Sequence, residues 1–393
     1  MTRQAVVVGA VRTAIGKFNG SLAPLSAPEL GSTVIRETLA RAGINASVVE
    51  EVIMGNALQA GLGQNPARQA AMAAGVPETV PSVTVNQVCG SGLRAVMLAA
   101  QAIRAGDAEV IVAGGMESMT NAPYLLPGAR AGYRMSDQTV VDGMVRDGLW
   151  CALGGVHMGA TAENVADRYK VTREAQDAFS VLSQHKAGAA MATGRFKEEI
   201  VPVTIPQRRG APLVFDTDEF PRPETTLEAL AKLSPAFQPG GTVTAGNASG
   251  INDGAAAVAV VSDKRAAELD LEPMARIVSY ATVGVDPSEM GIAPIFAARK
   301  ALDLADLKVR DLDLVEINEA FASQSVFVVR ELGLDEAKVN VNGGAIALGH
   351  PIGASGARIL ATLLYEMEKR ESHYGLAALC IGGGQGVAVV LER

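Results

Sequence analysis

Three residues whose side chains can take part in covalent chemistry lie beside glycine-rich backbone in this sequence. Cys89 lies in VNQVCGSGL, His350 in GGAIALGHPIGASGARI and Cys380 in ALCIGGGQG. A thiol attacks a carbonyl carbon once a base has removed its proton, and imidazole is well suited to that task near neutral pH. Glycine lets a bound substrate approach the backbone closely. Together the three residues predict transfer of an acyl group through sulfur.

Cys89 is expected at a turn between a strand and a helix. The segment from Ser82 to Val85 predicts a short buried strand, and apolar residues recur at helical spacing from Leu93 to Ile103. The free N–H groups and the dipole at a helix start favour a thiolate, so we expect a lowered pKa for Cys89. A free cysteine is more commonly a small buried hydrophobic residue. The glycines on both sides of the helix start favour the catalytic interpretation.

His350 differs in its setting from the other histidines. Gly349 and Pro351 hold it in a stiff turn just before a predicted helix. A lone histidine is more often a surface or core residue than a catalyst, and His185 and His373, in charged helical surroundings, receive that interpretation. His350 is therefore the predicted base for the Cys89 proton.

Other interpretations of the same polar residues predict different sites. A zinc site formed by Cys89, His350 and Cys380 lacks the CxxC or HxxxH spacing of zinc ligands, so we expect no metal. A disulfide between the two cysteines under oxidation is the better alternative. The glycine-rich stretches are not followed by an acidic residue about 20 positions on, as dinucleotide binding requires. Asn318 ends the apolar segment LVEIN and is suited to cap the helix that follows.

Four motifs in this order resemble the thiolase family. They are VCGSGL with Cys89, the NEAF that begins at Asn318, GHPIGASGAR with His350, and CIGGGQG with Cys380, and the resemblance covers essentially all 393 residues. It implies that Cys89 carries the acyl group and that Cys380 moves the α-proton. It further implies that His350 donates to the thioester oxygen of the second substrate and that Asn318 holds a water beside it. The backbone N–H groups of Cys89 and, by resemblance, Gly382 are the candidate oxyanion donors.

The resemblance also implies residues that line the coenzyme A site and the acyl pocket. They are Arg222, Ser249, His157, Met158, Phe237, Phe321 and Met290. The phosphates of coenzyme A need cations, and positive charge gathers at Arg208, Arg209, Arg222 and Lys232. Such a run is more commonly a solvated face.

Composition bounds the class of protein. Hydrophobic residues make up 48% and charged residues 19% of the chain, so it is globular rather than disordered. A net charge of −8 argues against a nucleic-acid or membrane-surface partner. Three cysteines are too few for a disulfide framework and favour a cytoplasmic location. No apolar run approaches the roughly 18 residues of a membrane span.

The two ends of the chain resemble each other. Sliding Leu39–Leu58 onto Leu302–Phe321 needs no gap, and both segments predict a helix, a turn and a strand. We therefore expect an α/β fold of two similar halves, residues 1–270 and 271–393, with a loop domain inserted at about 120–244 of the first. The resemblance implies that they form the layers α-β-α-β-α.

Within the family, HMGATAENVA and GHPIGASGAR are more similar to the short-chain, biosynthetic branch. Its members condense two acetyl-CoA to acetoacetyl-CoA and CoA and catalyse the reverse thiolysis, with the coenzyme A thioester as substrate and no separate cofactor. The alternatives are a degradative 3-ketoacyl-CoA thiolase of broader chain length, a ketoacyl synthase-like enzyme, and a non-catalytic lipid-binding relative. Thiolases are at least dimers, and Pro123 to Met135 resembles a tetramer-forming loop, which predicts a homotetramer.

Overall fold

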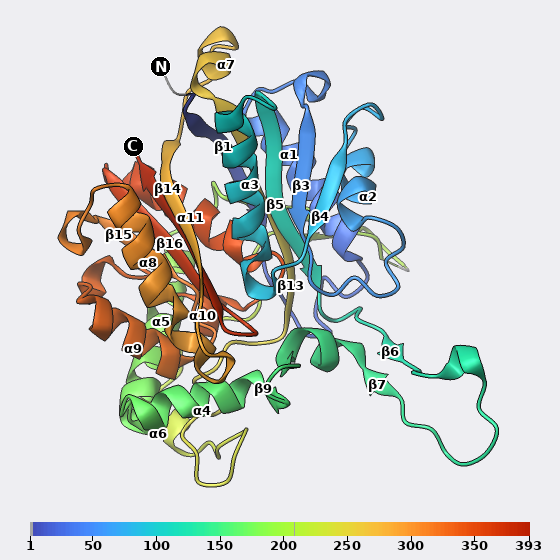
Figure 1. The fold of residues 1–393 in the computed structure, drawn as a ribbon, viewed down its shortest axis with the longest axis vertical. Coiled ribbons are helices and arrows are strands. Elements are labelled where there is room, and N and C mark those ends of the chain that lie inside the picture. The colour runs from blue at the N-terminus through green and yellow to red at the C-terminus, as the bar shows by residue number, and fades with distance from the viewer. Residues whose placement is uncertain (1–2, 208) are drawn as a thin grey trace.

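The computed structural model describes residues 3–207 and 209–393, and a long mixed sheet runs through it (Figure 1). The sheet order is β15-β16-β17-β14-β1-β13-β5-β3-β4. One half contributes β1 (Ala5–Thr13), β3 (Glu51–Gly55), β4 (Ser82–Val85), β5 (Val110–Ser118) and β13 (Asn252–Ser262). The other half contributes β14 (Ala275–Gly284), β15 (Leu314–Ile317), β16 (Tyr374–Ile381) and β17 (Gln385–Glu392). The short strands β2 (Gly16–Lys17) and β10 (Ile200–Val201) pair with β13 and β1.

The two halves repeat the same strand pattern. In the first, β5 lies between parallel β3 and antiparallel β13, and in the second, β16 lies between parallel β15 and antiparallel β17. The edge strand β4 pairs in parallel with β3, and in the second half a single parallel bridge from Val315 to Val339 takes its place. The halves join through antiparallel pairing of β1 with β14. This topology confirms the predicted α/β fold with duplicated halves.

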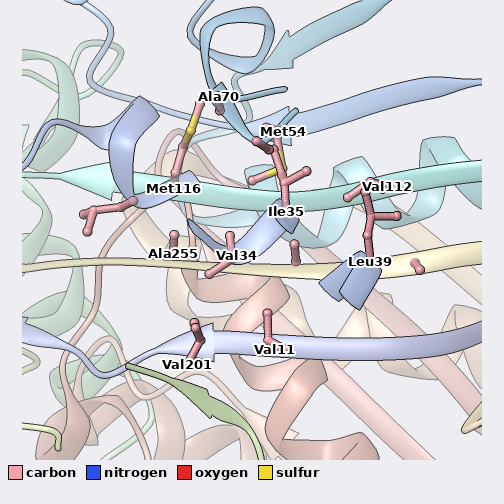
Figure 2. Close-up of a cluster of buried hydrophobic side chains, with 14 of the residues drawn as sticks. Val11, Val34, Ile35, Leu39, Met54, Ala70, Val112, Met116, Val201 and Ala255 are labelled. Atoms are coloured by element: carbon pink, nitrogen blue, oxygen red, sulfur yellow. The ribbon is translucent and has the colours of Figure 1, made fainter. Parts of the chain in front are cut away.

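Helices cover both faces of each half of the sheet. They are α1 (Ala27–Arg41), α2 (Pro66–Ala73), α3 (Ser91–Ala105), α7 (Asp263–Glu268), α8 (Ala293–Leu304), α9 (Ala322–Leu332), α10 (Ala345–Leu348) and α11 (Ser355–Lys369). One core lies between the first half of the sheet and α1 and α2; Figure 2 shows Met54, Val112 and Met116 from the strands meeting Val34 and Ile35 from α1. Nearly continuous apolar strands match burial on both faces.

The helices α3 and α11 lie between the two halves of the sheet and share one core. Their first turns cross closely because each carries a glycine. A Cβ on Gly92 would lie 2.8 Å from the backbone nitrogen of Ala357, and a Cβ on Gly356 would overlap the backbone of Leu93. Both helix starts are therefore held against each other at the centre of the molecule.

The segment between β5 and β13 forms an irregular layer below the sheet, with one long arm (Figure 1). The arm is closed by β6 (Tyr124–Leu125) and β7 (Val141–Asp142). The rest consists of β8 (Trp150–Cys151), β9 (Val156–His157), α4 (Met158–Arg168), α5 (Arg173–Ala192), β11 (Val203–Ile205), β12 (Leu213–Phe215) and α6 (Leu227–Ala231). Among the described residues, no helix is both long and apolar enough to cross a membrane.

Candidate active site

Cys89 lies on the predicted turn. The strand β4 ends at Val85, a 3-10 turn covers Val88–Gly90, and α3 begins at Ser91. The strand is an edge strand and only partly buried, so the expectation of a buried strand was wrong. Val88 has φ +46°, a conformation that costs a β-branched residue about 1–3 kcal/mol. The surrounding contacts thus hold the residue before Cys89 in a strained backbone.

The backbone N–H groups of Gly382 and of Cys89 itself lie near the Cys89 sulfur and act to lower its pKa. Burial nevertheless raises the pKa of Cys89 to about 11, with a smaller contribution from the Glu117 carboxylate. The lowered pKa expected from the helix start was therefore wrong, because loss of water outweighs the donors. In the free protein the group is a thiol, and it needs a base.

His350 lies in a loop whose backbone is fixed from both sides. Gly349 has φ +105° and packs on Asn252, whose side-chain oxygen accepts a hydrogen bond from the backbone N–H of His350 at 3.0 Å. The Nδ1 atom of His350 lies 2.5 Å from the Ser355 hydroxyl, which itself donates to the Pro351 carbonyl at 2.8 Å. Because that hydroxyl has one proton, it accepts from Nδ1–H, and Nε2 is left with its lone pair.

Burial and the nearby Arg358 guanidinium lower the pKa of His350 to about 3. The imidazole is therefore neutral, as a base must be. Asn318 places its side-chain nitrogen 3.4 Å from Nε2 of His350, so these two predicted residues do meet. Asn318 does not cap the next helix, because the residue at the start of α9 is Phe321. The capping interpretation was wrong.

Cys380 is fully buried near the end of β16, opposite Gly386 of β17. Burial raises its pKa, and the neighbouring Cys89 raises it further. The two thiols therefore lie close enough to interact. After Ile381 the chain turns through Gly383 and Gly384, both with φ above +80°, which places Gly382 beside Cys89.

One cavity of about 420 Å³ joins most of the predicted site residues. It is lined by Cys89, His157, Met158, Arg222, Phe237, Ser249, Met290, Phe321, His350 and Gly382, among others. Cys380 and Asn318 are fully buried and lie behind its wall: Cys380 packs in one apolar cluster with Met158, Met290 and Phe321, and Asn318 reaches the cavity through His350.

Aromatic rings form one wall of this cavity. His157 stacks on Phe237 with ring centroids 4.8 Å apart, and Phe237 meets Phe321 edge to face at 6.0 Å. The Nδ1 atom of His157 accepts the backbone N–H of Gly159 at the start of α4, and burial lowers the pKa of His157. Gly159 is needed there because a Cβ would overlap the Phe237 ring. The wall is thus apolar and uncharged, as a pantetheine arm requires.

Arg222 is the cation of the predicted basic cluster that lines the cavity. Its guanidinium lies 5.9 Å from the Phe220 ring centroid, and none of the ion pairs among the described residues involves it. Arg209 and Lys232 are exposed and do not line the cavity, and Arg208 lies outside the described residues. The cluster is therefore mostly a solvated face.

The sequence interpretation missed Glu117, Asn252 and Ser355, which hold the loops of the site. Glu117 lies near the end of the buried apolar strand β5, and a carboxylate at such a place is a signal that could have found it. Ser355 lies inside the GHPIGASGAR motif. Asn252 carries no local signal, because its partner is nearly 100 residues away in the chain.

A partly buried thiol near two backbone N–H groups, a neutral imidazole and a second thiol fit an enzyme that transfers acyl groups through sulfur. Residues 5–264 match the family description "Thiolase, N-terminal domain", and residues 271–393 match "Thiolase, C-terminal domain". The chain belongs to the thiolase family.

Similar proteins agree over the whole chain. The acetyl-CoA acetyltransferase of Pseudomonas aeruginosa is 62% identical over 388 residues, 99% of each chain. That of Escherichia coli is 60% identical over 392 residues, 100% of this chain and 99% of the relative. The crystal structure of the Bacillus anthracis acetyl-CoA acetyltransferase superposes with a TM-score of 0.97 at 46% identity, covering 100% of this chain and 99% of the other.

Proposed function

We propose that this protein is an acetyl-CoA C-acetyltransferase, which condenses two acetyl-CoA to acetoacetyl-CoA and CoA and catalyses the reverse thiolysis. The single observation that carries the reaction type is the meeting of Cys89, the Gly382 N–H and a neutral His350 at one cavity. The choice of substrate is supported by relatives of about 60% identity that are named acetyl-CoA acetyltransferase.

In the first half-reaction the sulfur of Cys89 attacks the acetyl carbonyl as Nε2 of His350 takes the thiol proton. The carbonyl oxygen becomes an oxyanion, which the N–H groups of Cys89 and Gly382 stabilise. The carbon–sulfur bond to coenzyme A then breaks, its thiolate takes the proton from His350, and CoA leaves. Cys89 keeps the acetyl group as a thioester.

In the second half-reaction the Cys380 thiol first gives its proton to Nε2 of His350, and the Cys380 thiolate then removes a proton from the methyl carbon of a second acetyl-CoA. The raised pKa of Cys380 makes that thiolate a strong base. The Nε2–H group of His350 and a water held by Asn318 stabilise the enolate oxygen; the Asn318 side-chain oxygen accepts no hydrogen bond from the described residues and is free to hold that water. The enolate carbon attacks acetyl-Cys89, the Cys89 thiolate leaves and takes the proton from Nε2 of His350, and acetoacetyl-CoA is released.

Coenzyme A enters along the aromatic wall. Its pantetheine arm lies against Phe237 and His157, and Arg222 offers positive charge for a phosphate. Ser249 lines the same side and offers a hydroxyl for hydrogen bonding.

Acetylation with acetyl-CoA alone tests the mechanism. After a brief incubation and acid quench, peptide mass mapping should find one acetyl group on Cys89. Cys151, which is buried at 3% exposure, is the internal control and should stay unmodified. An active protein that carries the acetyl group on Cys151, or nowhere, would contradict the covalent mechanism.

We further propose that the protein is a homotetramer. The arm exposes large apolar side chains, with Tyr124 at 68%, Met135 at 86% and Val140 at 53% exposure, more than a free surface loop usually carries. The edge strand β4 also leaves backbone groups unpaired, with Val83 at 40% exposure, and a second copy can extend the sheet there. Light scattering should give four subunits for the native chain and two for Met135→Asp combined with Tyr124→Asp.

A further inference from the structure

The carboxylate of Glu117 is fully buried near the end of β5 and accepts four hydrogen bonds. Oε1 accepts from the Asn56 side-chain nitrogen at 2.6 Å and from the Leu58 N–H at 3.1 Å. Oε2 accepts from the Ala57 N–H at 3.0 Å and from the Gly353 N–H at 2.8 Å. A buried carboxylate with this many donors is a junction between chain segments.

One donor belongs to the loop that carries His350, and the other three belong to the segment after β3 that packs against Cys89. Gly353 lies three residues after His350. Ala57 and Leu58 pack with Cys89 in one small apolar cluster, and the Ala57 carbonyl accepts a hydrogen bond from the Asn86 side chain at 3.4 Å. Glu117 thus links the segment that packs against Cys89 directly to the loop that carries His350.

The internal repeat explains the position of this junction. β5 and β16 are equivalent strands, and α3 and α11 are equivalent helices that both begin with Ser-Gly. Just after β16, the Gly382 N–H lies near the sulfur of Cys89, two residues before Ser91. Near the end of β5, Glu117 accepts from Gly353, two residues before Ser355. The same contact between a strand end and a helix start is reactive in one copy and purely polar in the other.

All four partners of Glu117 are donors, so its hydrogen bonds need the ionised carboxylate. Burial raises the pKa of Glu117 to about 7, and Asp253 on β13 adds to this, while the backbone donors act in the opposite direction. The charge also acts on Cys89, whose pKa it raises. Cys380 and His350 are further titratable groups beside Cys89, and Arg358 acts on His350.

We propose that Glu117 is a positioning residue of the reaction, which fixes the His350 loop relative to Cys89 through Gly353 and the Ala57–Leu58 segment. The inference rests on the proposed nucleophilic role of Cys89. Replacing Glu117 by glutamine converts one acceptor oxygen to an NH₂ group that faces N–H donors. The loops then separate, and the proton transfer from Cys89 to His350 loses its geometry.

The test compares three variants. Glu117→Gln removes the charge and an acceptor, and Glu117→Asp keeps the charge but shortens the reach by one methylene. Glu163→Gln is the matched control, because Glu163 is a buried carboxylate that also accepts several donors, from Thr242 and Val243, without contacting either loop. For each, kcat, KM, the melting temperature and the pH profile of Cys89 alkylation by iodoacetamide are measured.

Glu117→Gln should lose kcat by about a hundredfold with a much smaller change in KM, since a small misplacement of reacting groups has effects of that order. Its alkylation midpoint should move to lower pH, because thiolate formation no longer opposes a nearby negative charge. Glu117→Asp should lose kcat without that shift. Glu163→Gln should lower the melting temperature and leave the alkylation midpoint unchanged.

A Glu117→Gln protein with kcat within about twofold of the native value would overturn the proposal. So would an unshifted alkylation profile in that variant. If Glu117→Gln does not fold, Glu117→Asp decides through kcat alone. Alkylation needs no substrate, so a failure of acetyl-CoA to label Cys89 would reject the proposed function and still leave the role of Glu117 measurable.

Discussion

The two copies of the repeat place different side chains at the same strand end and the same helix start. The first-half helix α3 is preceded by Cys89 and the second-half helix α11 by Gly353, while β16 carries Cys380 and β5 carries Glu117. One pairing brings a thiol to N–H donors, and the other brings N–H donors to a carboxylate. Duplication thus supplies the same meeting of strand end and helix start twice. The copy at Cys89 carries the reacting thiol, and the copy at Gly353 holds the His350 loop in place.

The two equivalent serines show the same division. Ser91 accepts the Gln87 N–H at 2.9 Å and donates to the Val88 carbonyl, which stabilises the strained turn before Cys89. Ser355 donates to the Pro351 carbonyl in the same way, but its acceptor capacity goes to Nδ1 of His350. An identical helix start therefore caps backbone in one half and fixes an imidazole tautomer in the other.

The largest expected effect comes from removing the thiol at the end of β16. Cys380→Ala should reduce condensation and thiolysis by at least about 10³-fold, as losses of a reacting group commonly do. Cys89 should still accept an acetyl group, because proton transfer at carbon belongs to the second half-reaction. Steady-state rates and peptide mass mapping measure the two properties separately.

Cys151→Ala is the control, because Cys151 is a buried cysteine of the same apolar cluster as Cys380 but does not line the cavity around Cys89. It should keep both properties. Near-normal condensation by Cys380→Ala would show that the end of β16 does not carry a reacting group, and the proposed difference between β16 and β5 would be wrong.

The next effect separates the two serines. Ser355→Ala frees Nδ1 of His350 and lets the imidazole change tautomer, so kcat should fall by about a hundredfold, less than the roughly 10⁴-fold known for a fully lost tautomer-fixing charge. Ser91→Ala removes the two hydrogen bonds of its hydroxyl to the turn backbone, each worth about 1 kcal/mol of stability. It should mainly lower the melting temperature.

Rates and melting curves of both serine variants therefore test whether Ser355 acts on catalysis while Ser91 acts on stability. Equal rate losses would show that both serines only support backbone.

A third effect concerns the pH dependence of folding stability. His350 of the second half and Glu117 of the first half contribute to it with opposite signs. The pKa of His350 is lowered to about 3 in the folded protein, so the unfolded chain takes up its proton first as pH falls below about 6.5. The stability due to neutral His350 is present above pH 6.5 and is lost towards pH 3, by about 2 kcal/mol at pH 5. The pKa of Glu117 is raised to about 7, so its contribution has the opposite sign and favours folding as pH falls below 7.

Denaturant unfolding at pH 7.5 and pH 5 measures this. Between pH 7.5 and pH 5 the stability of the native protein should change less favourably than that of His350→Asn, and the stability of Glu117→Gln should change less favourably than that of the native protein. A His350→Asn protein whose stability changes as the native protein's does would show that His350 is not held neutral. His185→Asn is the control, because His185 is exposed.

Much of this site could be predicted from sequence because its chemistry lies in local motifs. The strand Ser82–Val85 and the helix after Cys89 have the predicted places, and four distant motifs converge on one cavity. The pKa of Cys89 could not be predicted, since it depends on burial by segments far along the chain. The role of Glu117 could not be predicted for the same reason, because Gly353, one of its donors, is 236 residues away. Local patterns thus predict reacting groups better than the groups that position them.

The smallest expected effect is in chain length, where both halves contribute to one wall. Met158 comes from the insertion, Met290 and Phe321 come from the second half, and all three are at least 92% buried around Cys380. Each added methylene gains about 0.8 kcal/mol when it is buried, so an open pocket would favour longer chains. Preference for four carbons must therefore come from steric exclusion.

We expect kcat/KM for thiolysis of acetoacetyl-CoA to exceed that for 3-ketohexanoyl-CoA by about tenfold, which corresponds to about 1.4 kcal/mol of discrimination. Methionine is flexible, so small 2-methyl branches should be partly tolerated. Met158→Ala should narrow the ratio by removing bulk contributed by the insertion, and Met135→Ala, at an exposed position on the arm, should leave it unchanged. Equal kcat/KM values for four-carbon and eight-carbon substrates in the native protein would instead indicate a thiolase of broad chain length. Met158, Met290 and Phe321 would then not exclude longer acyl chains from the pocket around Cys380.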